Sequence, residues 1–238
     1  MRKVINIVFL MLGFSLLAGC YNINRTQQLP ACSTVALISE LDNNITYHYV
    51  GSSVYANTDF QYAAPQLHPD AILVTPIKEA LEKSGYRVVV IHAPARYRFK
   101  DDTSNSDHLT FAQQHNVRQL LRGRQVDRVI ILTKATSVDY NHPEDQPFGY
   151  GYTQRDTILY KGTDVFAAVL IRIARPGELH VQTTQLAWME QHVDYDLFAK
   201  GEHQVSSLSV SYLNKWLSEK FAPELVVTLK RMGVTLVV

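Results

Sequence analysis

The sequence predicts an α/β fold in which a βαβαβ core is followed by a long antiparallel hairpin and a C-terminal helix, with a mixed sheet covered by helices. Three observations predict it. Short apolar runs alternate with segments of helical periodicity over residues 34–133, as is typical of parallel strands buried on both faces. Two long runs, residues 163–175 and 178–190, are joined through Pro176-Gly177, a dipeptide that suits a turn. A last helical segment covers residues 207–221.

The first strand and helix are predicted within residues 34–84. Residues 34–41 read TVALISEL, a compact apolar run with the composition of a buried strand. Residues 70–84 place apolar side chains on one side of a helix, and Gly85 follows at the position of a C-terminal cap. Pro76 leaves a second start open, in which the helix begins at Pro76 with Thr75 as its cap. Between strand and helix, residues 47–50 hint at an extended segment.

The second half of the core repeats this order. Residues 86–92, YRVVVIH, predict the second buried strand, and the polar residues 93–107 predict a loop. Residues 107–122 have the periodicity of an amphipathic helix that Gly123 ends. Residues 128–133, RVIILT, predict the third strand. Strands in this order are expected to be parallel and joined by right-handed crossovers.

The pattern changes after residue 139. Residues 141–154 are polar and contain glycine and proline, so they predict an irregular excursion. In the C-terminal helix the apolar residues Leu213, Trp216, Leu217 and Phe221 follow helical spacing, and Pro223 breaks or restarts the helix. Residues 234–238 predict a short final strand.

The first nineteen residues predict a secretory signal peptide. Arg2 and Lys3 precede a mostly apolar run over residues 4–17. This run is shorter than the roughly 20 residues of a membrane-spanning helix. The predicted organisation is therefore a signal peptide at residues 1–19, a lipidated cysteine with a flexible tether at residues 20–33, and a single domain at residues 34–238.

Leu17-Ala18-Gly19-Cys20 resembles the lipobox of bacterial lipoproteins and fits it at every position. The resemblance implies cleavage before Cys20, a diacylglycerol on its thiol and a fatty acid, such as palmitate, on its amino group. Tyr21 follows where an aspartate often means retention at the inner membrane in this family, so outer-membrane anchoring is expected, with the domain in the periplasm. An ordinary signal peptide that contains a cysteine is the alternative.

Composition limits the partners of the mature chain. Removal of residues 1–19, with Arg2 and Lys3, leaves 21 basic and 22 acidic residues. A nucleic-acid-binding protein normally has a clear basic excess, so no nucleic-acid partner is predicted. Cys32 is the only other cysteine, so the domain forms no internal disulfide and must be held by its core.

The element order of residues 34–238 resembles a periplasmic domain found in three groups of proteins. These are the curli-secretion channel lipoproteins, the lipoprotein activators of peptidoglycan synthases, and the N-terminal domain of the Tol-system translocation protein. The resemblance is one of element order and carries no functional residue with it. It implies a role in binding or assembly.

Motifs for known chemistry are missing from the sequence. It contains no G-x-S-x-G elbow, no phosphate-binding loop, no H-E-x-x-H and no cysteine pair for zinc. The stretches HVDYD at residues 192–196 and HPED at residues 142–145 contain metal-ligand side chains, but a solvated surface explains both equally well. No cofactor and no metal are predicted.

Two groups of residues are candidates for a site. Open α/β sheets bind ligands beyond the carboxyl ends of their strands, where Asp42 and His92 would lie and could form an acid–base pair. Phe148, Tyr150 and Tyr152 lie in a glycine-bearing segment and are candidates for a partner-binding loop. In the alternative, these rings fold back over the sheet.

The expected function is that of an outer-membrane-anchored lipoprotein. It would act as a non-catalytic binding or assembly factor in the cell envelope, with the lipid bilayer and an envelope protein, or a second copy of itself, as partners. The alternative is an anchored periplasmic hydrolase that uses an acid–histidine pair near the strand ends.

Overall fold

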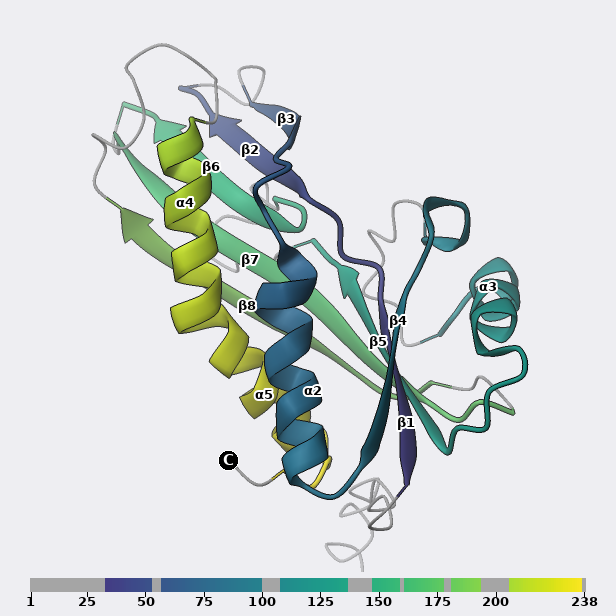
Figure 1. Cartoon of the computed structure of the whole chain (residues 1–238). Coiled ribbons are helices and arrows are strands. Elements are labelled where there is room, and N and C mark those ends of the chain that lie inside the picture. The colour runs from purple at the N-terminus through teal and green to yellow at the C-terminus, as the bar shows by residue number, and fades with distance from the viewer. Residues whose placement is uncertain are drawn as a thin grey trace, which may run out of the picture.

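The computed structural model describes residues 33–52, 57–99, 108–136, 147–158, 161–177, 181–193 and 206–236. These residues form one mixed sheet of eight strands with helices packed against it (Figure 1). The predicted α/β class is therefore confirmed. The predicted signal peptide, Cys20 and the tether lie outside the described residues. In the part of the chain that is described, no helix is long and apolar enough to span a membrane.

The centre of the predicted core is a group of three parallel strands. β1 (Thr34–Ser39) lies between β4 (Arg87–His92) and β5 (Arg128–Lys134). In the register, Leu37 of β1 pairs with Val90 of β4 and with Ile130 of β5. All three strands fall where apolar runs predicted them.

The long hairpin organises the rest of the sheet. It consists of β7 (Lys161–Ala174) and β8 (Val181–Val193), which pair along nearly their whole length. On its other edge, β7 pairs with β6 (Tyr150–Asp156) over its first half and with β5 over its second half. Beyond β6 lie β2 (Asn44–Val50) and then β3 (Thr58–Ala63). The sheet thus forks at β7 into one branch of β5, β1 and β4 and another of β6, β2 and β3.

Both helices that contain an internal proline use a π-helical turn to accommodate it. The turn Asp70–Val74 leads into α2 (Thr75–Lys83), and the Thr75 N–H donates to the carbonyl of Asp70, five residues back. A proline lacks an N–H and crowds the carbonyl four residues earlier, and the wider turn relieves both constraints. Residues 70–83 are therefore one continuous helix through Pro76, as the longer of the two predictions had it.

The C-terminal helix repeats this arrangement. It consists of α4 (Ser207–Trp216), the π-helical turn Leu217–Phe221 and α5 (Ala222–Arg231), with Pro223 in the first turn of α5. The predicted helix is confirmed, and Pro223 restarts it rather than ending it.

Four sequence predictions differ from the structure. Tyr150–Asp156 is a strand of the sheet and not part of an irregular excursion. Residues 234–236 form no strand; Val234 and Leu236 instead bury their side chains in the core. The helix expected at residues 107–122 is α3 (Phe111–Leu121), which starts later because Thr110 and Gln113 form a capping box. The short 3-10 helix Ala95–Tyr97 interrupts the predicted loop.

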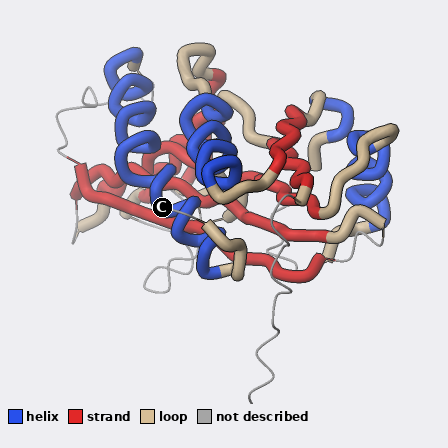
Figure 2. Tube along the Cα trace, turned by 60° about the horizontal axis from the view of Figure 1, so that its bottom comes forward, coloured by secondary structure: helices blue, strands red, loops and turns tan. Residues whose placement is uncertain are grey.

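Helices cover both faces of the β5–β1–β4 branch. Val35 and Leu37 of β1 belong to the core shared with α2, α4 and α5, whereas Ala36 and Ile38 pack with α3 on the opposite face. Figure 2 shows the sheet as a curved red layer with the helices beside it. β1 is thus buried on both sides, which explains its continuous apolar sequence.

Candidate functional site

A cleft opens beside the short segment that connects β1 to β2. The chain leaves β1 at Ser39 and enters β2 at Asn44. α2 then leads to β4 on one face of the sheet, and α3 leads from β4 to β5 on the other. The carboxyl end of β1 is therefore a point at which the connections diverge, and open α/β sheets bind ligands at such points.

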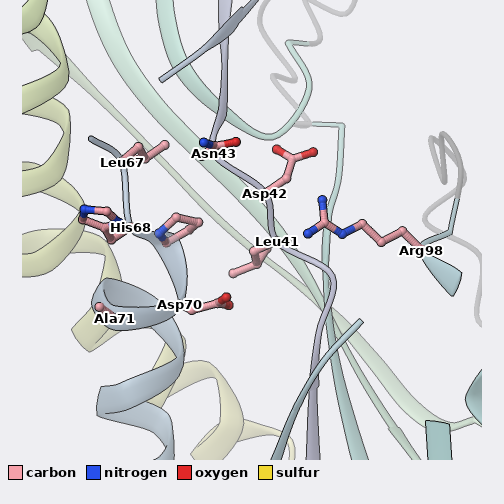
Figure 3. Close-up of a pocket in the computed structure, with 9 residues that line it drawn as sticks. Leu41, Asp42, Asn43, Leu67, His68, Asp70, Ala71 and Arg98 are labelled. Atoms are coloured by element: carbon pink, nitrogen blue, oxygen red, sulfur yellow. The ribbon is translucent and has the colours of Figure 1, made fainter. Parts of the chain in front are cut away.

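The cleft has a volume of about 400 Å³ and a wall of mixed polar and apolar side chains (Figure 3). One side is formed by the residues that follow β1, a second by the segment that begins the α2 helix, and a third by the loop after β4. The lining side chains are Leu41, Asp42, Asn43, Leu67, His68, Pro69, Asp70, Ala71 and Arg98.

Asp42 is held by a buried lysine. Nζ of Lys134, at the end of β5, lies 2.5 Å from Oδ1 of Asp42 and 2.6 Å from the carbonyl oxygen of Asn44. The backbone N–H of Asn44 also donates to Asp42 Oδ1, at 2.9 Å. Burial lowers the pKa of Lys134, and the negative charge of Asp42 offsets part of that shift. Asp42 therefore stabilises the charge of a lysine that has little contact with water.

Tyr150 completes this cluster beneath the cleft. Its hydroxyl donates to the carbonyl oxygen of Asp42, and Lys134 Nζ lies 4.3 Å from the centre of its ring. Burial, followed by the nearby carboxylates, raises the Tyr150 pKa well above its usual value. Gly149 has a φ of +80°, and a Cβ there would lie 2.8 Å from Cδ of Lys134. Glycine at this position leaves room for the lysine side chain.

The candidate partner-binding aromatics lie inside the protein. Tyr150 and Tyr152 both have 0% exposure, and the Tyr152 hydroxyl donates to the Ser209 carbonyl oxygen at 2.6 Å. The prediction that these two rings face a partner is therefore wrong, because the segment is a strand whose side chains enter the core. Phe148 is half-buried, and its carbonyl accepts from Thr46 Oγ1 at 2.5 Å. A partner contact by Phe148 stays a prediction.

The predicted acid–histidine pair forms with a different acid. His92 Nδ1 lies 2.9 Å from Oδ2 of Asp70, and not beside Asp42. Ser39 Oγ donates to the other oxygen of Asp70 at 2.6 Å. The sequence contained no signal for this pairing, because Asp70 begins a helix and His92 ends a strand, and only the fold brings the two together.

The order of these three side chains argues against an activated serine. In a Ser–His–Asp triad the imidazole lies between the other two and removes the proton of the serine. Here the carboxylate of Asp70 lies in the middle, and Ser39 Oγ accepts a hydrogen bond from the Leu41 N–H at 3.3 Å. Ser39 is also only 2% exposed. The arrangement therefore holds the ends of β1 and β4 against the helix and does not prepare a nucleophile.

Arg98 gives the cleft a cation that has no carboxylate partner among the described residues. Its Nε donates to the Ala93 carbonyl oxygen at 3.1 Å, and Figure 3 shows the guanidinium directed toward the side of the cleft that holds Asp42. Among the described residues Arg98 forms no ion pair, whereas Asp42 is paired with Lys134 and Asp70 with His92. Sequence reasoning missed Arg98, which lies in a segment expected to be a loop.

The described residues include no group of three or more histidine, cysteine, aspartate or glutamate side chains that could hold a metal ion. His192 is within this part of the chain and pairs with Asp164, 3.1 Å away. Asp194, Asp196 and residues 142–145 lie outside the described residues.

The chain matches no protein-family model and no curated protein. Among solved structures it is similar to a Xanthomonas campestris protein of the DUF330 family, with a TM-score of 0.41, 6% identity and coverage of 86% of this chain and 88% of that one. A hypothetical protein from Chlamydia trachomatis gives a TM-score of 0.36, 12% identity and coverage of 84% and 96%. A lipoprotein from Neisseria meningitidis gives a TM-score of 0.32 and 12% identity, with coverage of 86% of this chain and 99% of that one. At these low TM-scores the three structures support no argument about function.

Proposed function

We propose that this protein is a lipid-anchored component of the bacterial cell envelope that binds an acidic group of a ligand or partner in the cleft without transforming it chemically. Lipidation at Cys20 attaches it to the outer membrane, and its domain lies in the periplasm. The lipobox at residues 17–20 supports the anchor. The charge arrangement of the cleft supports binding.

The observation that carries the proposal is the pairing of charges around Arg98. Each cleft carboxylate already has a side-chain partner, Lys134 for Asp42 and the imidazole of His92 for Asp70. The guanidinium of Arg98 lines the same cleft and has no such partner among the described residues. An incoming carboxylate or phosphate would form the bidentate hydrogen bonds that a guanidinium favours. Arg98 is therefore the residue that selects an acidic ligand.

Catalysis by the Asp70–His92 pair is the second candidate. The His92 side chain is 60% exposed, and Asp70 fixes its Nδ1, so its Nε2 is available to act as a base on water. His92 does not line the cleft. Binding without chemistry therefore accounts better for the cleft.

Photocrosslinking in intact cells tests the proposal. A photoreactive amino acid replaces His68, an exposed residue on the rim of the cleft, in the full-length lipoprotein. The matched control carries the same amino acid at Lys220, which is exposed on the C-terminal helix and does not line the cleft. Mass spectrometry should find a discrete adduct from position 68 alone. Equal adducts from both positions, or none from position 68, would contradict binding at the cleft.

Two variants separate the remaining possibilities. Cys20→Ser should release the protein from the membrane fraction, and its retention there would contradict the lipid anchor. His92→Gln should leave the yield of the position-68 adduct unchanged. If His92→Gln instead makes the adduct accumulate, an uncleaved substrate is being trapped and the hydrolase alternative is correct.

A further inference from the structure

The end of the domain at which the described chain begins is rich in cations. Ser33 is placed there by the Arg87 N–H, which donates to its carbonyl oxygen at 3.0 Å. The described segments around it are residues 33–34, 82–87, 122–128 and 173–177. Together they contain six cations and two carboxylates. The cations, called the cationic end below, are Lys83, Arg87, Arg122, Arg124, Arg128 and Arg175.

The topology gathers these residues from distant parts of the sequence. β1, β4 and β5 are parallel, so all three begin at this end of the sheet, and the antiparallel β7 finishes there. α2 and α3 lead directly into β4 and β5, so both helices also end on this side (Figure 1). Arg87 and Arg128 are the first residues of their strands. The cations are scattered along the sequence, and the fold brings them together at one end of the sheet.

The positive charge at this end is only partly offset within it. Of the two carboxylates, Glu82 pairs with Lys78 at 2.6 Å, and Asp127 accepts a hydrogen bond from the Thr34 N–H at 2.7 Å. The complete chain has 23 basic and 22 acidic residues. Among the described residues of this end, an excess of four positive charges is therefore an asymmetry and not a reflection of overall composition.

Helix dipoles account for only part of this cluster. A cation in the last turn of a helix is favourable, and Lys83 occupies such a position in α2. Arg128 and Arg175 lie instead at the paired ends of β5 and β7 and belong to no helix. Burial and the neighbouring Arg175 lower the pKa of Arg128. Two arginines placed side by side concentrate positive charge at this end of the fold.

We propose that the cationic end docks on the anionic phospholipid headgroups of the membrane that holds Cys20. This inference rests on the lipid anchor of the proposed function. A coil with the length of residues 20–33 has an end-to-end distance of roughly 20 Å, and charges act over about 8 Å at physiological salt. The anchor therefore keeps the cationic end within reach of the bilayer surface, and each lysine or arginine that reaches it strengthens docking about fivefold.

The docked orientation determines where the cleft opens. The cationic end lies at the amino ends of β1, β4 and β5, whereas the cleft lies at the carboxyl end of β1. A strand of six residues is about 20 Å long. Docking would thus hold the cleft away from the membrane and open to the periplasm, where a ligand or partner can enter it.

Fluorescence quenching in vesicles tests the docking. The full-length acylated protein carries Cys32→Ser and a fluorophore on a cysteine introduced by Gly177→Cys, an exposed position at the cationic end with open space around its Cα. The control carries the fluorophore at Ser52→Cys, an exposed residue after β2. A quencher attached to lipid headgroups should dim the label at position 177 in vesicles that contain phosphatidylglycerol, and high salt should reverse the effect. In pure phosphatidylcholine, and at position 52, quenching should stay weak.

Two triple variants make the test specific for the cationic end. Lys83→Gln/Arg87→Gln/Arg124→Gln removes three of its cations and should weaken docking by roughly a hundredfold, at about fivefold per cation. The control removes the same charge at exposed lysines elsewhere, as Lys161→Gln/Lys215→Gln/Lys220→Gln, and should leave docking unchanged.

The outcomes separate this inference from the anchor. Equal quenching at position 177 in neutral and anionic vesicles, or equal loss in both triple variants, would overturn docking through the cationic end. If the wild-type protein does not float with vesicles of either composition, the lipid anchor itself is absent and the inference falls with it.

Discussion

Removing either partner of the buried ion pair beneath the cleft should destabilise the protein, but by unequal amounts. Asp42→Asn leaves Lys134 without its counter-charge, and the lysine side chain is only 7% exposed. Lys134→Met leaves Asp42, whose side chain is 26% exposed and keeps its hydrogen bond from the Asn44 N–H at 2.9 Å. We expect the first substitution to be the more damaging, because it leaves the more deeply buried charge uncompensated.

The magnitudes follow from what each variant leaves behind. Breaking a buried pair by removing one partner costs about 3–5 kcal/mol. For Asp42→Asn we expect about 3 kcal/mol, since the Asn44 carbonyl and the Tyr150 ring still face Lys134. For Lys134→Met we expect about 1.5 kcal/mol, the usual loss of one charge-assisted hydrogen bond, because water reaches the remaining carboxylate. The double variant should be more stable than Asp42→Asn alone.

Urea denaturation monitored by circular dichroism measures these differences at neutral pH. The Asp42→Asn variant also has a diagnostic pH dependence. Without Asp42 the pKa of Lys134 falls further below its unfolded value of 10.5, so the unfolded chain binds more protons and the variant gains stability as the pH rises toward that value. Two results would refute this reasoning. In the first, Lys134→Met is less stable than Asp42→Asn. In the second, the double variant is less stable than both single variants.

Three further predictions concern the fold around the site. Gly151→Ala should lower the free energy of unfolding by about 4 kcal/mol or more, since the added Cβ would lie 1.8 Å from the Thr46 carbonyl oxygen. Thermal denaturation measures this loss. The control is Gly177→Ala, which we expect within about 0.5 kcal/mol of wild type. Burial raises the Tyr152 pKa, so the protein should lose about 1.4 kcal/mol per pH unit from this group above its unfolded value of 10.0; Tyr152→Phe should flatten that slope in denaturation curves at alkaline pH. Thr110→Ala should cost about 1 kcal/mol by removing the cap of α3, and an unchanged denaturation midpoint would argue against the cap.

The elements that could be predicted from the sequence are those with a strong local signal. The apolar runs at β1, β4 and β5 are continuous because these strands are buried on both faces. The Pro176-Gly177 turn and the long runs beside it identified the β7–β8 hairpin. In each case one short segment contains the information that determines its structure.

The errors arose where distant contacts decide the structure. Gly149 lies just before β6 and Gly151 lies within it, and both glycines favour a turn. The strand forms because this segment pairs with β2 and β7. The burial of Tyr150 depends on Lys134 and Asp42, which lie in other elements. Hydroxyl-bearing rings beside glycine look the same in sequence whether they face a partner or a buried ion pair.

The candidate site was partly predicted for the same reason. The carboxyl ends of the strands were expected to contain polar groups, and Asp42 indeed lines the cleft. The acid that pairs with His92 is Asp70, which a crossover helix brings to the strand ends. Arg98 reaches the cleft from a loop, and a single arginine in a polar loop has no sequence signal that separates it from Arg96, which instead lies over the Tyr97 ring.

The most direct test of an anion-selective cleft compares these two arginines. The adduct formed in cells by the photoreactive residue at position 68 is quantified in Arg98→Gln and in Arg96→Gln backgrounds, which change the charge equally and differ in whether the residue lines the cleft. Selection of an acidic ligand by Arg98 predicts that Arg98→Gln abolishes the adduct while Arg96→Gln leaves it intact. An adduct that survives Arg98→Gln, or that both variants reduce equally, would contradict it.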